Sequence, residues 1–336
     1  MKSGLSNLTA IVPLDLENRP KEIIERAKLL ALAAEAADVS IIFGLNDRNY
    51  APERKLKESL KGIQHTEISS AALDFKSVNM SALRNLAFTK VTTSFLTLLD
   101  VDIWPDFKLL KKYQLFIENG IRPYYFLPCI YLTAFGSKKL MRTLETPSSL
   151  TGKYFSFSRK EFMHLASPSS VTIMKSEDYQ TINGFNQNFI GHGYEDFDFM
   201  LRLASLYSEV KASSGFLKPQ DSRSPLFATG FKKELGRICF SALLAKDFTY
   251  HLHHPKNTSS TFNSSRPSNF QTFEALHQSF VNELTEEDDT LITDFLTYCK
   301  AHGKSIKEYS ALFENKPGHV DRYDTLRRRI RFLLNK

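Results

Sequence analysis

The sequence predicts an α/β fold: a mixed, mainly parallel β-sheet flanked by helices, followed by a small C-terminal helical extension. Over the first hundred residues, apolar runs of strand length alternate with runs of helical periodicity. Acidic residues stand directly after several of the apolar runs. The chain has 336 residues, 42% of them hydrophobic, which is enough for the core of one such domain and a smaller appendage.

The first part of the chain follows the order strand, helix, strand, helix, strand. Buried strands are expected at residues 8–14, 39–44 and 95–99, and helices at residues 20–37 and 81–90. The first of these helices begins with a proline and spaces its apolar residues at helical intervals. Such alternation is typical of a parallel sheet, which binds ligands beyond the carboxyl ends of its strands. The acids that fall just past the expected strand ends are Asp15, Asp47, Asp100 and Asp102.

The later part of the chain is more varied. Further strands are expected at residues 124–134, 170–175 and 247–253, and a helix at residues 195–207. Residues 211–233 are rich in Ser, Pro and Gly and indicate a mobile loop, while residues 255–267 have the composition of a linker. We therefore expect an α/β domain over residues 1–260 and a helical extension over residues 261–336.

Net charge, cysteine content and the lack of long apolar runs limit the binding partners, the disulfides and the cellular location that we expect. The formal net charge of +7 favours anionic partners such as nucleotides, phosphorylated glycans or membrane surfaces. No basic-aromatic motif is present, so we expect no nucleic-acid partner. The three cysteines, Cys129, Cys239 and Cys299, lie far apart and argue against a disulfide framework. With no secretion signal and no membrane-spanning apolar run, we expect a cytoplasmic protein.

An acidic pair, Asp100 and Asp102, ends the apolar run FLTLL. Two carboxylates one residue apart at a strand end can bind a divalent cation and a ribose hydroxyl together, and Mg²⁺ and Mn²⁺ prefer oxygen ligands of this kind. A solvated turn is the alternative for a D-x-D pattern taken alone. Its place directly after a buried strand favours the metal site.

A second acidic cluster follows a turn that contains two glycines. The turn Gly191–Gly193 precedes Glu195, Asp196 and Asp198 at the start of an expected helix. Glycine lets the backbone approach a ligand closely, and the helix dipole keeps a carboxylate in the first turn ionised, as a base must be. Ordinary capping of the helix is the alternative, but three acids with two glycines and an aromatic favour a site.

Two further segments carry groups that suit the same chemistry. Arg84 lies in the expected helix SALRNLA, and its fixed fork of donors suits a diphosphate, although an ordinary surface arginine is the alternative. His251, His253 and His254 cluster near the end of the strand at 247–253. On a strand, the first two share one face and His254 lies on the other, and either face offers a nitrogen to a metal.

Together these segments resemble a glycosyltransferase of the GT-A fold, of the family 2 type. The family order is kept by four segments: AIVPLD, VSIIFGLND, SALRNLA and FLTLLDVD. A later segment, INGFNQNFIGHGYEDFDFMLRL, is similar to the C-terminal motif of galactosyltransferases and chondroitin-polymerase-like enzymes, N-G-F…G-x-G-x-E-D-x-D…R-L. The resemblance covers roughly residues 8–255.

The resemblance implies a metal-dependent, inverting transfer of a hexose or N-acetylhexosamine from a UDP-sugar. The acceptor would be a hydroxyl of an oligosaccharide, a polysaccharide or a lipid-linked glycan, in bacterial capsule or surface polysaccharide synthesis. Asp102 would bind Mn²⁺ or Mg²⁺, with Asp100 beside it on the metal or the ribose. His251 or His254 would complete the metal shell.

The remaining roles implied by the resemblance concern the nucleotide and the acceptor. Asp15 and Asp47 would contact the uridine, with Arg84 nearby. Asp196 would be the base that deprotonates the acceptor hydroxyl, and Glu195 would hold acceptor or donor hydroxyls. The family often has Trp and Gly where this chain has His192 and Tyr194. We therefore expect the contacts of this chain with its acceptor to differ from those of the family.

Two alternatives stay open. Residues 323–336 place apolar residues at helical spacing among four arginines, which suits either peripheral contact with an anionic membrane or a helix packed on the domain. For the whole chain, the alternative is a non-catalytic nucleotide- or glycan-binding module that keeps the fold. The presence of the acids at positions 100, 102, 195 and 196 speaks against that alternative.

Overall fold

The computed structural model describes residues 6–73, 78–158, 160–219, 224–255, 264–284 and 289–314. The chain forms two units that interleave in sequence. The first unit comprises Met1–Tyr125, Ser170–Ser208 and Lys256–Leu276, and the second comprises Phe126–Ser169, Glu209–Pro255 and His277–Lys336. The division of the chain at residue 260 stays a prediction, and residues 323–336 lie outside the described residues.

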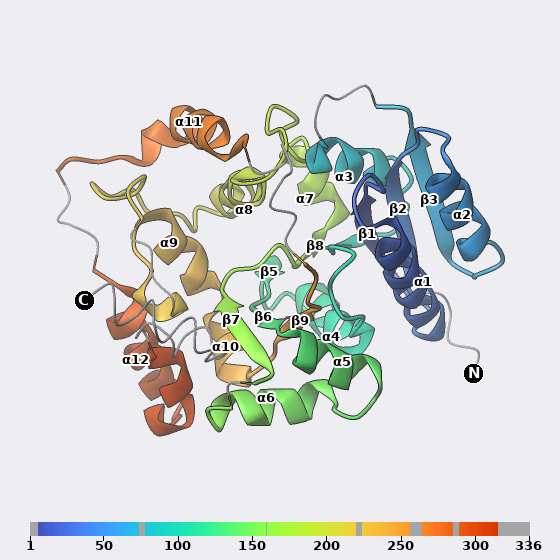
Figure 1. The fold of residues 1–336 in the computed structure, drawn as a ribbon. Coiled ribbons are helices and arrows are strands. Elements are labelled where there is room, and N and C mark those ends of the chain that lie inside the picture. The colour runs from blue at the N-terminus through green and yellow to red at the C-terminus, as the bar shows by residue number, and fades with distance from the viewer. Residues whose placement is uncertain are drawn as a thin grey trace, which may run out of the picture. The chain divides into compact units, whose positions relative to one another are not determined.

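A six-stranded sheet forms the centre of the first unit, with the strand order β3-β2-β1-β4-β8-β5 (Figure 1). Its strands are β1 (Leu8–Leu14), β2 (Ser40–Asn46), β3 (Thr66–Ala71), β4 (Phe95–Leu98), β5 (Tyr124–Phe126) and β8 (Thr172–Lys175). The pairs β1–β2, β1–β4 and β2–β3 are parallel, whereas β8 runs antiparallel to β4. This mixed, mainly parallel sheet confirms the predicted fold class.

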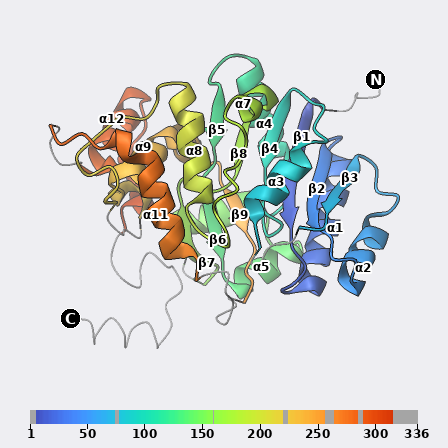
Figure 2. The same cartoon turned by 90° about the horizontal axis from the view of Figure 1, so that it is seen from above.

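Helices cover the sheet of the first unit. They are α1 (Pro20–Ala36), α2 (Ala51–Leu60), α3 (Met80–Phe88), α4 (Phe107–Glu118), α7 (Ser176–Thr181), α8 (Glu195–Leu206) and nearly all of α11 (Arg266–His277). Helices α1 and α2 pack on each other, and α3 packs on β1 and β2 (Figure 2). The crossovers through α1 and α2 run opposite to the one through α3, and right-handed connections then put them on opposite faces.

A glycine in β2 lets α3 lie close to the sheet. A Cβ atom at Gly44 would stand 1.9 Å from the carbonyl oxygen of Leu83. This distance is too short for any residue with a side chain. The next residue of α3 is Arg84, whose guanidinium reaches Asp100 beyond the end of β4. The close approach of α3 and β2 therefore positions an arginine at the carboxyl edge of the sheet.

The second unit contains a three-stranded sheet in the order β7-β6-β9, made of β6 (Cys129–Leu132), β7 (Phe162–Ala166) and β9 (Thr249–His251). Its helices are α5 (Ala134–Met141), α6 (Pro147–Phe155), α9 (Gly230–Ile238), α10 (Phe240–Ala245) and α12 (Leu291–Ala301), with the 3₁₀ turns η1 (Pro225–Phe227), η3 (Gln278–Phe280) and η4 (Ile306–Phe313). The hydroxyl of Tyr250 lies 2.6 Å from that of Thr151 and donates to the carbonyl of Pro147 at 2.9 Å. These bonds fasten β9 to α6.

Several expected elements differ from the observed ones. Residues 124–134 form two strands in different sheets, β5 and β6, separated by Pro128, which lacks a backbone N–H for a ladder. The strand expected at 247–253 ends at His251, so the alternation that puts His251 and His253 on one face does not continue. Part of the expected loop at 211–233 is helical: it contains η1 and the start of α9. Helix α2 and strand β3 were not predicted.

The expectations on cysteines and membrane spans can be compared with the described part of the chain. Cys129, Cys239 and Cys299 are buried and form no disulfide there. Among the described helices, none combines the length and the apolar character that a membrane crossing requires.

The close packing of Gly44 predicts a loss of stability in Gly44→Ala. The added methyl group overlaps the carbonyl of Leu83, so we expect the free energy of unfolding to fall by about 1–3 kcal/mol, the usual range for overpacking. Urea titration followed by circular dichroism measures the change. Gly152→Ala is the matched control, because α6 leaves nothing within 4 Å of the new Cβ. That control should be neutral or slightly stabilising, and an unchanged stability in Gly44→Ala contradicts the packing.

Candidate functional site

Arg84 is a buried arginine that joins the two acidic clusters of the first unit. Its side chain is 4% exposed, its Nη2 donates to Asp100 Oδ1 at 2.8 Å, and its Nη1 lies 3.3 Å from Asp196 Oδ1. The guanidinium also lies over the ring of Phe185, 4.7 Å from its centroid, in a cation–π contact. One cation thus connects the loop after β4 with the first turn of α8.

Two asparagines hold α3 against the segment that leads into α8. The side chain of Asn79 caps α3 and donates to the carbonyl of Gln187 at 2.8 Å. Asn85 Oδ1 accepts from the backbone N–H of Phe185 at 2.9 Å and from the hydroxyl of Tyr179 at 2.7 Å, while its Nδ2 donates back to the carbonyl of Phe185 at 2.8 Å. The asparagine after Arg84 and the N-G-F segment therefore form one connection.

Asp198, the third acid of the cluster, has a structural role in this arrangement. It is 1% exposed, and its Oδ2 accepts from Nε and Nη2 of Arg202 at 2.9 and 2.8 Å. Arg202 in turn donates to the carbonyl of Gly184 at 2.8 Å. Asp198 and Arg202 thus fix the turn that carries Phe185, which leaves Glu195 and Asp196 as the acids of the candidate site.

Glu195 and Asp196 begin α8 after a strained turn. Gly193 and Tyr194 both have positive φ, 113° and 70°, and the backbone N–H of Gly193 donates to Glu195 Oε2 at 2.7 Å. The Asp196 side chain keeps 30% exposure. Burial nevertheless raises its pKa to about 7, against the pull of Arg84, and the charges of Glu195 and Asp100 act in the same direction as burial. A carboxyl that titrates near neutrality suits a general base.

Asp102 lies between Arg26 of α1 and Arg19, the residue that immediately precedes α1. Its Oδ2 accepts from Arg19 Nη2 at 3.0 Å, and its Oδ1 accepts from Arg26 Nη1. Glu22 contacts the same two guanidinium groups, with Oε2 3.3 Å from Arg19 Nη1 and Oε1 bonded to Arg26 Nη2. These four residues form a closed ring of alternating charge, which we call the α1 charge ring.

Asp15 and Asp47 follow β1 and β2 but differ in their surroundings. Asp15 is buried, and its Oδ2 accepts from Arg48 Nη2 at 2.7 Å and from Asn46 Nδ2 at 3.2 Å. Asp47 pairs with Lys57, and this hydrogen bond lowers the pKa of Asp47 below its ordinary value. Asp15 therefore belongs to a polar cluster at the strand ends, whereas Asp47 is held by a nearby helix.

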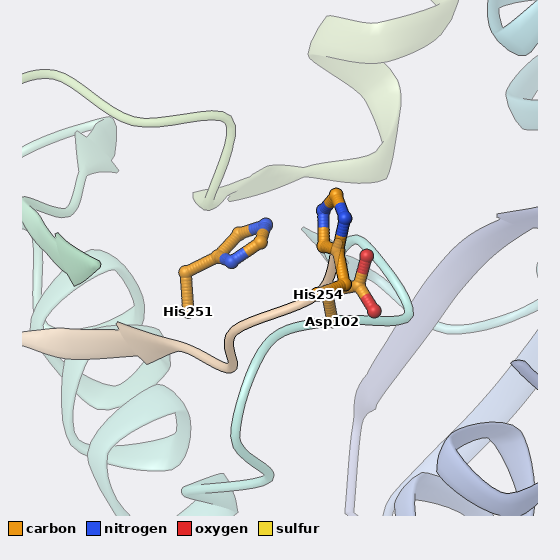
Figure 3. A group of neighbouring side chains, drawn as sticks. All are labelled: Asp102, His251 and His254. Carbon is orange, nitrogen blue, oxygen red and sulfur yellow. The ribbon is translucent and has the colours of Figure 1, made fainter. Parts of the chain in front are cut away.

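Figure 3 draws Asp102 of the first unit with His251 and His254 of the second unit. In the second unit, the His251 ring stacks on Tyr131, with centroids 4.3 Å apart and planes at 14°. Tyr131 stacks on His164 in the same way, at 4.2 Å and 17°. The three rings are cross-strand partners on β9, β6 and β7, so the sheet fixes the orientation of His251.

His254 lies beyond the end of β9, and a backbone carbonyl orients its ring. Its Nδ1 is 3.1 Å from the oxygen of Pro255. Because that oxygen can only accept, we assign the proton to Nδ1 and the lone pair to Nε2. This is the tautomer in which a histidine coordinates a metal through Nε2.

Each of the two units holds donor groups of a kind that divalent cations accept. Each oxygen of Asp102 accepts a hydrogen bond from one arginine, and a carboxylate oxygen has a second lone pair for a metal. The second unit offers the imidazole nitrogens of His251 and His254. Oxygen and imidazole nitrogen are both ligands that divalent cations of the first transition series accept.

The structure brings together four of the site residues expected from sequence, namely Arg84, Asp100, Glu195 and Asp196. Sequence reasoning missed the residues that surround the others: Arg19, Arg26, Arg48, Tyr131 and His164. Arg19 and Arg26 carried no signal for their contacts, because Asp102 lies 83 and 76 residues away from them in the sequence. The ring stack on β6 carried none, since strand partners are distant in sequence.

Known structures that resemble this chain are glycosyltransferases of low sequence identity. S. aureus TarS 1-349 is 13% identical, with 91% of this chain and 81% of that chain covered and a TM-score of 0.38. The mannosyltransferase PcManGT from Pyrobaculum calidifontis, in complex with GDP-Man and Mn²⁺, is 11% identical, with 98% and 88% covered and a TM-score of 0.39. The catalytic domain of Drosophila beta1,4galactosyltransferase 7, in complex with xylobiose, is 14% identical, with 58% of this chain covered and a TM-score of 0.32. This chain spans 59% of the length of that Drosophila chain.

Sequence comparison identifies the family. Among curated proteins, no sequence matches the chain at a significant level. The model of the family described as glycosyltransferase like family 2 matches residues 9–278. This region includes every residue of the arginine-linked acidic clusters and both histidines. The chain belongs to the family 2-like glycosyltransferases.

Proposed function

We propose that the chain is a metal-dependent, inverting glycosyltransferase that moves a hexose or N-acetylhexosamine from a UDP-sugar to a glycan hydroxyl. The observation that carries this proposal is the contact of buried Arg84 with both Asp100 and Asp196. A donor-side acid and a candidate base are thereby held in one network. Membership of the glycosyltransferase family supports the reaction class.

On the donor side, the polar cluster of Asp15, Asn46 and Arg48 suits the uridine. Its carboxylate, amide and guanidinium groups supply both acceptors and donors at the carboxyl ends of β1 and β2. We assign Asp47 to the same region, held in place by Lys57. Asp100 is one-third exposed and is held by Arg84 and by the hydroxyl of Ser170 at 2.7 Å, which suits contact with the ribose or the metal.

We propose Asp102 as the carboxylate ligand of Mn²⁺ or Mg²⁺, with His251 or His254 as the imidazole ligand. When bound, such a cation supplies charge neutralisation for the departing diphosphate. The chain holds its candidate ligands in place beforehand: Arg19 and Arg26 orient Asp102, and the Tyr131 stack orients His251.

On the acceptor side, Asp196 takes the proton from the attacking hydroxyl, and Glu195 holds a neighbouring hydroxyl. Attack from the face opposite the leaving group gives inversion at the anomeric carbon. His192 and Tyr194 precede Glu195 and Asp196 in the sequence and are our candidates for acceptor contacts. NMR of the first-formed product tests the stereochemistry, because a retained anomer contradicts direct displacement.

The acceptor we propose is an oligosaccharide, a polysaccharide or a lipid-linked glycan, in synthesis of a bacterial capsule or other surface polysaccharide. The basic segment at residues 323–336 suggests peripheral membrane contact at the inner face of the membrane, with the catalytic unit in the cytoplasm. Deleting that segment and measuring binding to anionic vesicles tests the contact, which unchanged binding rules out.

A panel of UDP-sugars with Mn²⁺, measured by thermal shift and by release of UDP, tests the proposed reaction. At least one donor should stabilise the protein and be hydrolysed slowly in a metal-dependent way. Asp102→Asn should abolish that hydrolysis. Binding without any turnover, in the presence of glycan acceptors, favours the non-catalytic binding module instead.

Removing the candidate base should separate catalysis from donor binding. In Asp196→Asn we expect kcat to fall by about 10²–10⁴-fold, the usual contribution of a general base, while UDP binding changes little. UDP release and calorimetric UDP titration measure the two quantities. Asp198→Asn is the matched control, because the same change two residues away affects the bond to Arg202. It should lower the melting temperature and reduce kcat far less than Asp196→Asn does.

The raised pKa of Asp196 predicts that activity depends on pH near neutrality. The ionised carboxylate is the active base, and burial raises its pKa to about 7, so kcat/KM should fall as pH decreases through that value. Below the pKa the slope should approach about tenfold per pH unit, and above it the profile should level off. Circular dichroism at each pH controls for unfolding. A profile that is flat across this range contradicts the role of Asp196.

A further inference from the structure

The two arginines of the α1 charge ring differ in their exposure to solvent. Arg26 and Asp102 are nearly buried, with side-chain exposures of 5% and 8%. Arg19 and Glu22 reach the solvent, at 25% and 33%. Both oxygens of Asp102 are occupied, one by each arginine. Any further partner of Asp102 must therefore share its carboxylate with two guanidinium groups.

The backbone of Arg19 is strained. It stands immediately before α1 with φ 55° and ψ 39°, the left-handed conformation that non-glycine residues rarely adopt. Such a conformation costs on the order of 1–3 kcal/mol and tends to occur where it serves a function. Here the strain directs the guanidinium of Arg19 toward Asp102 beyond β4.

The charges of the ring set a condition on metal binding. Two carboxylates and two guanidinium groups sum to zero. A divalent cation at Asp102 brings two positive charges close to both arginines, and this repulsion opposes its binding. The diphosphate of a UDP-sugar carries two negative charges, which restore the balance and offer new acceptors for a guanidinium fork.

We infer that Arg19 is a binding residue for the donor diphosphate, which it reaches by leaving Asp102 when metal and nucleotide bind. Arg26, being buried, stays as the positioning residue of the carboxylate. The inference rests on the proposed role of Asp102 as a metal ligand. It follows that Arg19 opposes binding of the metal alone and favours binding of the nucleotide with the metal. Metal and nucleotide therefore increase each other's affinity, as linkage requires.

Arg19→Asn tests the inference in two directions, because asparagine tolerates the left-handed conformation but carries no charge. Without nucleotide, Mn²⁺ measured by calorimetry or by electron paramagnetic resonance should bind about fivefold more tightly, since one repelling charge is gone. With saturating Mn²⁺, UDP should bind about tenfold more weakly, since a charge-assisted contact is lost. Arg19→Lys should restore much of the UDP affinity.

Lys21→Asn is the matched control. Lys21 is exposed in the first turn of α1, two residues after Arg19, and its removal changes the net charge by the same unit. It should leave both affinities within about twofold of the original values, as expected for a screened surface charge. If Lys21→Asn reproduces both effects, the cause is net charge and the inference is wrong.

The remaining outcomes separate this inference from the proposed function. Asp102→Asn should abolish Mn²⁺ binding, and if it does not, the metal assignment itself fails. If Asp102→Asn abolishes binding but Arg19→Asn changes neither affinity, only the inference fails. If Arg19→Asn weakens Mn²⁺ binding without nucleotide, Arg19 merely orients Asp102, and the exchange of partners is likewise contradicted.

Discussion

The contact of Arg84 with Asp100 and Asp196 is the constraint on which the first unit depends. A guanidinium that is 4% exposed loses its hydration, and only nearby carboxylates can compensate for that loss. Removing either acid would leave a poorly compensated charge inside the protein. The neighbouring hydrogen bonds hold Arg84 in place. Asn79 and Asn85 fix the helix that carries Arg84, and Arg202 fixes the turn that carries Phe185, whose ring lies against the guanidinium.

Asp102 and Asp196, the proposed metal ligand and the proposed base, lie in different surroundings. Asp102, the proposed metal ligand, accepts a hydrogen bond from each of two arginines, and these bonds orient its carboxylate. Burial raises the pKa of Asp196 toward neutrality, as a base requires, and the charges of Glu195 and Asp100 add to this effect while Arg84 opposes it. The two acids therefore differ in their partners, because Asp102 is paired with two arginines whereas Asp196 shares one arginine with Asp100.

The sequence predicted the parts of this arrangement that local patterns encode. Buried strands with acids at their ends predicted the sheet and the place of Asp100, and glycines before an acidic helix start predicted the place of Asp196. Long-range pairing was not predicted, because no local pattern shows that Arg26 reaches Asp102 or that Tyr131 stacks on His251. The two-strand division of residues 124–134 was missed for the same reason, since sheet membership depends on distant partners.

Helix α11 supports the turn before α8, although it follows the boundary predicted at residue 260. The sequence places this helix in the extension, yet in the first unit Phe273 packs against the ring of Tyr194, with centroids 5.3 Å apart, and Arg266 lies over the same ring at 5.1 Å. Asn269 donates to the carbonyl of Ile190 at 2.9 Å, so the helix also fastens the glycine turn. Tyr194 needs this support, because its left-handed backbone is unfavourable for a residue with a side chain. The acceptor contacts that we propose at this turn would therefore depend on a helix that follows residue 260, and the family match, which extends to residue 278, includes this helix.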